Sequence, residues 1–350
     1  MVTELAVNAP SFPTRIFSVP LGLPRPAQNF CRTVAYRRPW ALRIHQPHAE
    51  RHSMIQAPQT TFNRRDIHQQ VTDTIIQQLE KGVIPWQKPW NGAENRLMAL
   101  PKNLTTGKKY RGVNILLLWT SAFNNEFLTD EWGSFLQWQD KKEAVRKGEK
   151  GTMIVYFDTL EKEEDGELKK IPFLKQSVVF NRCQLASYDS AAENPNLLND
   201  TSLVERIEQV DKFVTNTSAV IENLGFGAFY DRDDDKITMP YKEAFNNTEH
   251  CTATEGYYSA LLHELTHWTG NSKRIDRKFG DNVYATEELV AELGAAFMCA
   301  EFGINVAEKS NTAAYIDYWL NVLKDNKHCL LTAASEASKA VDFLQGLQPT

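Results

Sequence analysis

The sequence has no run of about eighteen or more apolar residues, so we expect no segment to span a membrane. Cysteine is scarce, with five in 350 residues, and the five are scattered without the spacing of a zinc site or a disulfide framework. We therefore expect free thiols and a reducing, cytoplasmic environment. The 42% hydrophobic content is enough for two cores of ordinary domain size.

Residues 1–60 differ in composition from the rest of the chain. They hold eight of the fifteen prolines, and seven arginines against two acids, without apolar periodicity. This composition predicts a disordered basic leader. It is also Arg-rich and acid-poor like an organelle transit peptide, and a third alternative is that translation begins at Met54.

The remaining chain predicts an α+β protein with two domains. A helix followed by β-like runs suggests a first domain over residues 61–185, the polar stretch 186–200 suggests a linker, and a second domain follows over 201–345. Residues 61–182 carry 19 Lys and Arg against 16 Asp and Glu, whereas residues 183–350 carry 13 against 26. The basic character is thus expected in the first domain and the acidic character in the second.

The strongest chemical pattern is the HExxH pentapeptide His263-Glu264-Leu265-Thr266-His267. Helix positions i and i+4 face the same way, so both imidazoles can bind one Zn²⁺ while Glu264 lies beside the metal as a general base. The alternative is an amphipathic helix with ordinary surface or core histidines. A dense apolar stripe at helical spacing beside the two histidines favours zinc, with Gly270 placed to end the helix.

A zinc site of this kind needs a third protein ligand. In the long metzincin motif a histidine would fall at Lys273, whose ammonium cannot bind a metal, so that class is excluded. A second helix is predicted over residues 286–302 with Thr286 as its N-cap, and it carries Glu288 and Glu292 one turn apart.

This arrangement resembles the gluzincins, in which the first acid of such a pair binds zinc and the second orients a ligating histidine. The resemblance implies that Glu288 is the third ligand and Glu292 the orienting carboxylate. The alternative for both Glu287 and Glu288 is that they are first-turn acids favoured by the helix dipole. Glu287 is expected to matter less for the metal, because only Glu288 stands one turn from Glu292. Tyr284 is a candidate oxyanion donor, and the fallback ligands are Asp276, Asp281 and His328.

Other elements of the second half fit the same scaffold. We expect a helix over residues 203–224 and a β-hairpin that includes Ile237–Met239, which we predict to be an edge strand that pairs with an extended substrate. The acids between Asp231 and Asp235 do not form a calcium loop, because lysines occupy the positions of its glycine and its final acid.

The first domain interleaves aromatic rings with cations. Single-stranded nucleic acid is bound by such surfaces, since bases stack on rings and phosphates pair with Lys and Arg. Tryptophans are nevertheless more often core residues than stacking platforms. The candidate DNA-binding residues are Trp86, Trp90, Lys102, Lys108, Lys109, Tyr110, Arg111, Arg146, Lys147 and Lys150.

Three stretches of this domain resemble the N-terminal domain of the ArdC-type antirestriction proteins: Trp86–Trp90, Pro101–Asn114 and Val145–Thr152. The second half is similar to that family's metallopeptidase domain through His263–Gly270 and Glu287–Phe297. The resemblance implies a protein of a mobile element whose first domain binds single-stranded DNA and which protects incoming DNA from host restriction.

Two functions are therefore expected as alternatives. In the first, the protein is a zinc peptidase with an unknown protein substrate, and single-stranded DNA is its partner through residues 61–185, separably from the metal. In the second, it is a single-stranded DNA coat protein whose zinc site is structural or incidental. Glu264 favours the first, because a structural site has no need of a base and is usually closed by four ligands.

Overall fold

Helix α1, Ile67–Glu80, opens the part of the chain that the computed structural model describes, and the Asp66 side chain caps it by accepting from the His68 backbone N–H. The described residues are 66–87, 99–164, 167–190, 202–225, 227–278, 283–307 and 312–349, and all of them lie in one unit, Arg65–Thr350. The predicted leader 1–60, Trp90, Asp281 and residues 191–200 of the predicted linker lie outside them.

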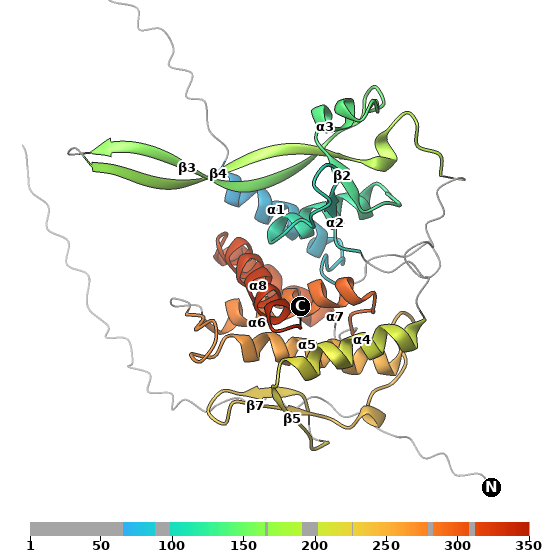
Figure 1. Cartoon of the computed structure of the whole chain (residues 1–350), viewed down its shortest axis with the longest axis vertical. Coiled ribbons are helices and arrows are strands. Elements are labelled where there is room, and N and C mark those ends of the chain that lie inside the picture. Colours follow the sequence, from blue (N-terminus) through green and yellow to red (C-terminus); the bar gives the residue numbers. More distant parts are fainter. Residues whose placement is uncertain are drawn as a thin grey trace, which may run out of the picture. The chain divides into compact units, whose positions relative to one another are not determined.

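The N-terminal segment builds a mixed sheet in the order β1-β2-β4-β3. Strand β1 runs parallel to β2, and β4 runs antiparallel to both β2 and β3. Figure 1 shows β3 and β4, in green, as a long twisted pair. After α1 the elements of this segment are β1 Lys102–Asn103, α2 Val113–Asn124, β2 Glu131–Gly133, α3 Phe135–Asp140, β3 Thr152–Glu164, β4 Glu167–Asn181 and the short helix η1 Arg182–Gln184.

The C-terminal segment combines five helices with a second, three-stranded sheet. Its two longest helices, α6 and α8, pack against each other, and α5 packs against both. The elements are α4 Leu203–Asn216, β5 Val220–Asn223, β6 Phe229–Asp231, β7 Lys236–Met239, η3 Lys242–Ala244, α5 Ala253–Thr269, α6 Val283–Phe302, α7 Thr312–Asp325 and α8 Cys329–Gly346.

The expected edge strand is wrong. The β6–β7 hairpin is present, but β7 is the central strand of the order β5-β7-β6 and has neighbours on both sides. The helix expected over 203–224 ends at Asn216, and the chain then forms β5, which pairs parallel with β7. Both backbone edges of β7 are therefore occupied, so it cannot pair with a substrate.

The start of α6 also differs from the prediction. The helix begins at Val283, so Thr286 lies inside it and does not cap it. Thr286 is buried, and its hydroxyl lies 3.5 Å from Cys329 Sγ at the start of α8.

One apolar cluster joins the N-terminal and C-terminal segments. It includes Val71 and Ile75 of α1 and Leu116 of α2 together with residues of α5, α6, α7 and α8. Trp86 is fully buried, and its Nε1 donates to the Tyr315 hydroxyl of α7 at 3.0 Å. The two segments therefore share a core in addition to meeting at a surface.

Helices α5 and α6 approach each other closely at Gly294. A Cβ at this position would lie 2.5 Å from Cγ2 and 2.7 Å from Oγ1 of Thr266, which belongs to the HExxH turn. Thr266 is itself fully buried. Glycine is thus required for the distance at which α6 meets the histidine-bearing face of α5.

We expect Gly294→Ala to lower the free energy of unfolding by about 1–3 kcal/mol, because the added methyl overpacks a filled interface. Gly346→Ala is the matched control, since a Cβ there meets nothing within 4 Å and should leave stability unchanged or slightly raised. Urea denaturation of both variants measures the difference. Equal stability of Gly294→Ala and the wild type would contradict the close approach.

Candidate metal centre

Helix α5 is fixed at its start and along its buried face. A capping box holds the first turn: Thr252 Oγ1 accepts from the Glu255 N–H at 3.2 Å, and Glu255 Oε2 accepts from the Thr252 N–H at 3.0 Å. The apolar stripe predicted from the sequence is buried, as expected, with Leu262 and Leu265 fully enclosed. The opposite face of the helix therefore presents its histidines in a fixed direction.

Two imidazoles and one carboxylate converge on that face. His263 Nε2 and His267 Nε2 lie 3.2 Å apart, and Glu288 of α6 places Oε2 3.8 Å from His263 Nε2 and Oε1 3.5 Å from His267 Nε2. Ligands about 2.0–2.1 Å from one tetrahedral ion lie about 3.3 Å apart, so the two nitrogens and this carboxylate have the spacing of a metal-ligand set. Among the described residues, His263, His267 and Glu288 form the one group with this potential.

A carboxylate behind His267 fixes the direction of its ring. His267 Nδ1 lies 3.1 Å from Glu287 Oε1, and a carboxylate can only accept, so Nδ1 carries the proton and Nε2 keeps its lone pair for a metal. Burial alone would raise the pKa of Glu287, but hydrogen bonds from His267 and Arg277 outweigh it and lower that pKa. Glu287 is therefore a stable carboxylate at neutral pH.

Arg277 holds Glu287 in place. Its guanidinium is 1% exposed and bonds both carboxylate oxygens, with Nε donating to Glu287 Oε2 at 3.0 Å. Nη2 also donates to the Thr266 carbonyl of α5 at 2.7 Å. A Cβ at Gly270 would lie 2.6 Å from Nη2, which explains the glycine at the end of α5 by a close approach, since its φ of −76° is open to any residue.

The sequence suggested Glu292, and not Glu287, as the carboxylate that orients a histidine ligand. For His267 this carboxylate is Glu287, which lies at Nδ1, while Nε2 faces His263 and Glu288. Glu292 is buried and hydrogen-bonds Tyr315. A role for Glu292 at His263 stays a prediction.

Some of the other predicted site residues lie close to the metal ligands, and some lie far from them. Glu264 is buried, and its charge helps to raise the pKa of His267 against the lowering effect of burial. Tyr284 is 71% exposed, and the charge of Glu288 is the first cause that raises its pKa. Its role as an oxyanion donor stays a prediction. Tyr318 of α7, which the sequence analysis did not single out, also has its pKa raised, first by burial and then by Glu288.

Neither of the described fallback ligands joins the cluster. Asp276 pairs with Lys278 at 2.9 Å, and the His328 ring lies 4.4 Å from the ring of His68 in α1. Both are outside the group formed by the two HExxH histidines and Glu288.

Comparison with known proteins agrees with this geometry. Residues 208–336 match the family model of a zincin-like metallopeptidase, and residues 65–180 match that of the N-terminal domain of the anti-restriction factor ArdC. The crystal structure of metal-free antirestriction ArdC from the R388 plasmid is 38% identical, with a TM-score of 0.65 over 81% of this chain and 97% of that one. The chain belongs to the ArdC antirestriction family. Both the sequence resemblance and the α+β class with its two family segments are confirmed.

Other relatives of this ArdC-family chain bear on metal and context. The Mn(II)-bound structure of R388 ArdC is 36% identical, with a TM-score of 0.62 over 81% of this chain and 98% of that one. A Sinorhizobium fredii protein, y4eC, is 32% identical over 81% of this chain and 92% of its own length. Two Escherichia coli proteins named DNA primase TraC are 31% identical over 80% of this chain, which spans only 20% and 27% of their length. The zincin-like match indicates a metal site, and the Mn(II)-bound relative leaves its metal open.

The candidate DNA-binding residues fall into three groups. Trp86 is fully buried, so the prediction that it stacks on bases is wrong; Trp132 and Trp138 are buried as well. Arg146 donates to the carbonyls of Leu185 and Cys183 at 2.8 and 2.7 Å, which is a structural use of its guanidinium. The tryptophans that the structure describes lie in the core, and the composition alone could not tell the two uses apart.

The other cations lie at the surface. Lys102 is within 3.6 Å of Asp130 and Glu131, and the half-buried Tyr110 accepts from Asn103 at 3.2 Å. Lys109 and Arg111 pair with acids of the C-terminal segment, Glu301 and Asp342 respectively. Lys108, Lys147 and Lys150 are exposed. The described part of the chain contains no helix with the length and apolar composition needed to cross a bilayer.

We expect Glu288→Gln to remove most of the metal affinity, and Glu287→Gln to weaken it about 10- to 100-fold, because Glu287 holds the ring of a ligand. This second expectation replaces the lesser role that the sequence suggested for Glu287. Glu249→Gln, at a side chain 85% exposed, should have no effect. Calorimetric titration of the metal-free protein with Zn²⁺ and Mn²⁺ measures all three, and unchanged affinity in Glu287→Gln would contradict the contact with His267.

Proposed function

We propose that this chain is an antirestriction protein that binds single-stranded DNA and carries a zinc-dependent peptidase site on His263, His267 and Glu288. The single observation that carries the peptidase proposal is the convergence of these three ligand atoms, with the carboxylate of Glu264 beside them. Two nitrogens and one oxygen suit Zn²⁺, which binds such ligands more tightly than Mn²⁺ does. Three ligands leave a position open for chemistry.

The chain's own residues fit amide hydrolysis. When bound, the metal supplies a Lewis acid that activates water and polarises a carbonyl. Glu264 accepts the proton that the attacking water loses and delivers it to the leaving amine, since it lies next to the ligands on the same helix. We assign the oxyanion donor to Tyr284, whose exposed side chain precedes Glu288 by one turn on α6. Glu287 and Arg277 keep His267 in the tautomer that leaves Nε2 for the metal.

The alternative is a single-stranded DNA coat protein whose metal site plays no part in protection. The relation to TraC favours this alternative, because most of this chain corresponds to a part of proteins named DNA primases. Coating needs cations and stacking rings, and it needs no general base. Glu264 is therefore the residue that separates the two proposals.

We expect Glu264→Gln to lose protection of incoming unmodified DNA while it keeps metal and single-stranded DNA binding. The carboxamide is nearly isosteric and cannot accept a proton, so only chemistry is removed. Transfer of a plasmid into restricting and non-restricting recipients measures the protection, and Glu249→Gln is the control. Full protection by Glu264→Gln with bound metal would favour the coat function.

DNA binding is expected to depend on the exposed lysines of the N-terminal segment. Replacing Lys108, Lys147 and Lys150 by Ala should weaken binding to all single-stranded sequences alike and flatten the salt dependence, as expected for phosphate contacts. Lys212→Ala and Lys278→Ala in the acidic segment are the matched controls. Fluorescence anisotropy with full-length protein is the measurement, because the shared core argues against cutting the segments apart. If the control variants lose as much affinity for single-stranded DNA, the assignment of DNA binding to the N-terminal segment is refuted.

A further inference from the structure

The β3–β4 hairpin has two faces, and both expose aromatic rings. Its register pairs Phe157 with Leu174, and the next position pairs Asp158 with Phe173. Side chains alternate along a strand, so Phe157 and Leu174 share one face and Phe173 lies on the other. Phe157 is 69% exposed and Phe173 is 37% exposed. On the second face Lys175 pairs with Asp158 and lies 5.4 Å from the centre of the Phe173 ring.

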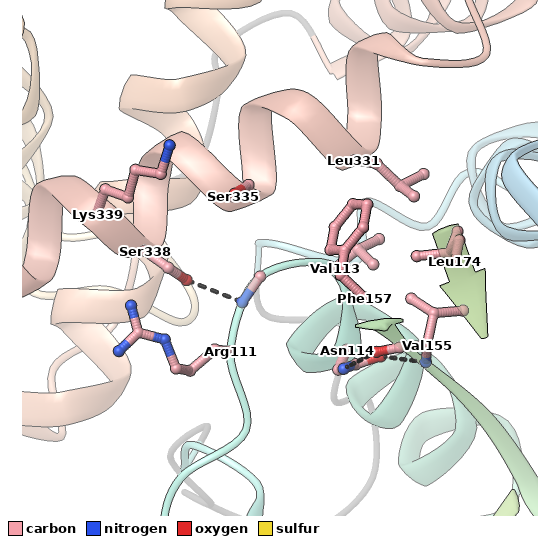
Figure 2. A pocket seen from close by; sticks show the side chains of 11 residues that line it. Arg111, Val113, Asn114, Val155, Phe157, Leu174, Leu331, Ser335, Ser338 and Lys339 are labelled. Atoms are coloured by element: carbon pink, nitrogen blue, oxygen red, sulfur yellow. Dashed lines mark hydrogen bonds between the residues drawn. The ribbon is translucent and has the colours of Figure 1, made fainter. Parts of the chain in front are cut away.

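A cavity of about 230 Å³ lies over the first face only. The hairpin supplies Phe157 and Leu174, and α8 supplies Leu331. Figure 2 shows these apolar side chains on one side of the cavity, and Arg111, Lys339 and Ser338 on the other. The cavity therefore has an aromatic and aliphatic wall that faces two cations.

The backbone around this cavity is already hydrogen-bonded. The Gly112 N–H donates to Ser338 Oγ at 2.8 Å, and Asn114 bonds both the N–H and the carbonyl of Val155, at 2.8 and 2.7 Å (Figure 2). The polar groups left for a ligand are the cations and the serine hydroxyls. A ligand with a flat apolar ring and an attached anion matches this set.

The cations at the cavity are held by exchangeable partners. Arg111 pairs with Asp342, and their side chains are 59% and 47% exposed; Lys339 pairs with Glu336 at 2.7 Å. Exposed pairs of this kind contribute about 0–1 kcal/mol, so a phosphate can replace the carboxylate without disturbing the fold. Asp342 then acts as a competitor of the phosphate.

A second cavity of about 390 Å³ continues past Arg111. The two cavities share Arg111 and Ser338, and the second is also lined by Lys108, Lys109 and Glu301. Lys109 pairs with Glu301 as Arg111 pairs with Asp342. A DNA strand that runs along residues 108–111 could place one base in the first cavity. Its phosphates on either side of that base would then meet cations.

We propose that the cavity beside Phe157 receives one unpaired base of single-stranded DNA, with Arg111 and Lys339 on its phosphate and Asp342 as the displaced carboxylate. This inference rests on the proposed DNA-binding function and assigns it a site. A cavity of about 150 Å³ holds a benzene ring, so the volume here admits a larger ring. A base within a duplex has no free face to offer, which gives a physical reason for preferring single strands.

The test compares full-length wild type, Phe157→Ala and the opposite-face control Phe173→Ala in binding to a fluorescent oligothymidine. Phe157→Ala should weaken binding about 5-fold or more, as expected from the loss of one stacked base. Phe173→Ala should stay within about 2-fold of wild type. Asp342→Asn should strengthen binding about 2- to 5-fold at low salt, and this gain should shrink as salt rises.

An oligonucleotide with abasic positions separates the base from the phosphate. With it the penalty of Phe157→Ala should vanish, whereas the gain of Asp342→Asn should remain. Circular dichroism and metal content should be the same in all variants. If the wild type binds no single-stranded DNA, the proposed function itself fails.

Three other results would overturn the site alone while the wild type still binds. If Phe157→Ala and Phe173→Ala change the affinity for oligothymidine equally, the DNA prefers neither face of the β3–β4 hairpin. A Phe157→Ala penalty that persists on abasic DNA would mean that no base stacks there. Weaker binding by Asp342→Asn would make Asp342 a structural partner of Arg111 and not a competitor.

Discussion

The buried ion pair between Arg277 and Glu287 is the interaction on which the metal centre depends. Removing a guanidinium from water costs several kcal/mol, and here the cost is offset by two bonds to one carboxylate and a third to the Thr266 carbonyl of α5. The pair ties the segment after α5 to the start of α6 and fixes the ring of His267 between them. Loss of either partner would leave a buried charge, so the geometry of the ligands and the stability of this corner are coupled.

The sequence predicts the local part of this centre and misses the long-range part. The spacing of His263 and His267 follows from helix geometry alone, and the ligand role of Glu288 on the second helix follows from the resemblance to the gluzincins. Adjacent helix positions such as Glu287 and Glu288 point about 100° apart, so which of them meets Nδ1 of His267 and which meets Nε2 depends on how α5 crosses α6. That crossing is set by Gly294 and Thr266, whose contact no periodicity reveals. The same limit explains β7, whose second neighbour is a strand that the sequence suggested was helix.

Burial of the tryptophans shows the same limit in the N-terminal segment. In the sequence, Trp86 belongs to a stretch of aromatic and basic residues that suggests a binding surface. In the structure its ring is fully buried and donates a hydrogen bond to Tyr315, 229 residues away in the chain. The apolar cluster that contains it also contains residues of α5 and α6, which carry the metal ligands. The two family segments thus share one core, and a change in the N-terminal segment can reach the metal centre through packed side chains.

The shared core also changes what the charge distribution means. Residues 183–350 carry twice as many acids as bases, which suggests simple repulsion of DNA. At the boundary, however, Glu301 and Asp342 from that segment lie on the cations Lys109 and Arg111. These acids keep the cations neutralised until a polyanion competes for them, so a lone anion gains little while consecutive phosphates displace several carboxylates together. Binding should therefore depend steeply on strand length, because each added phosphate in reach removes a further carboxylate and releases further counterions. An acidic domain beside a modestly basic one can then favour long single strands over mononucleotides, which a larger net positive charge would not achieve.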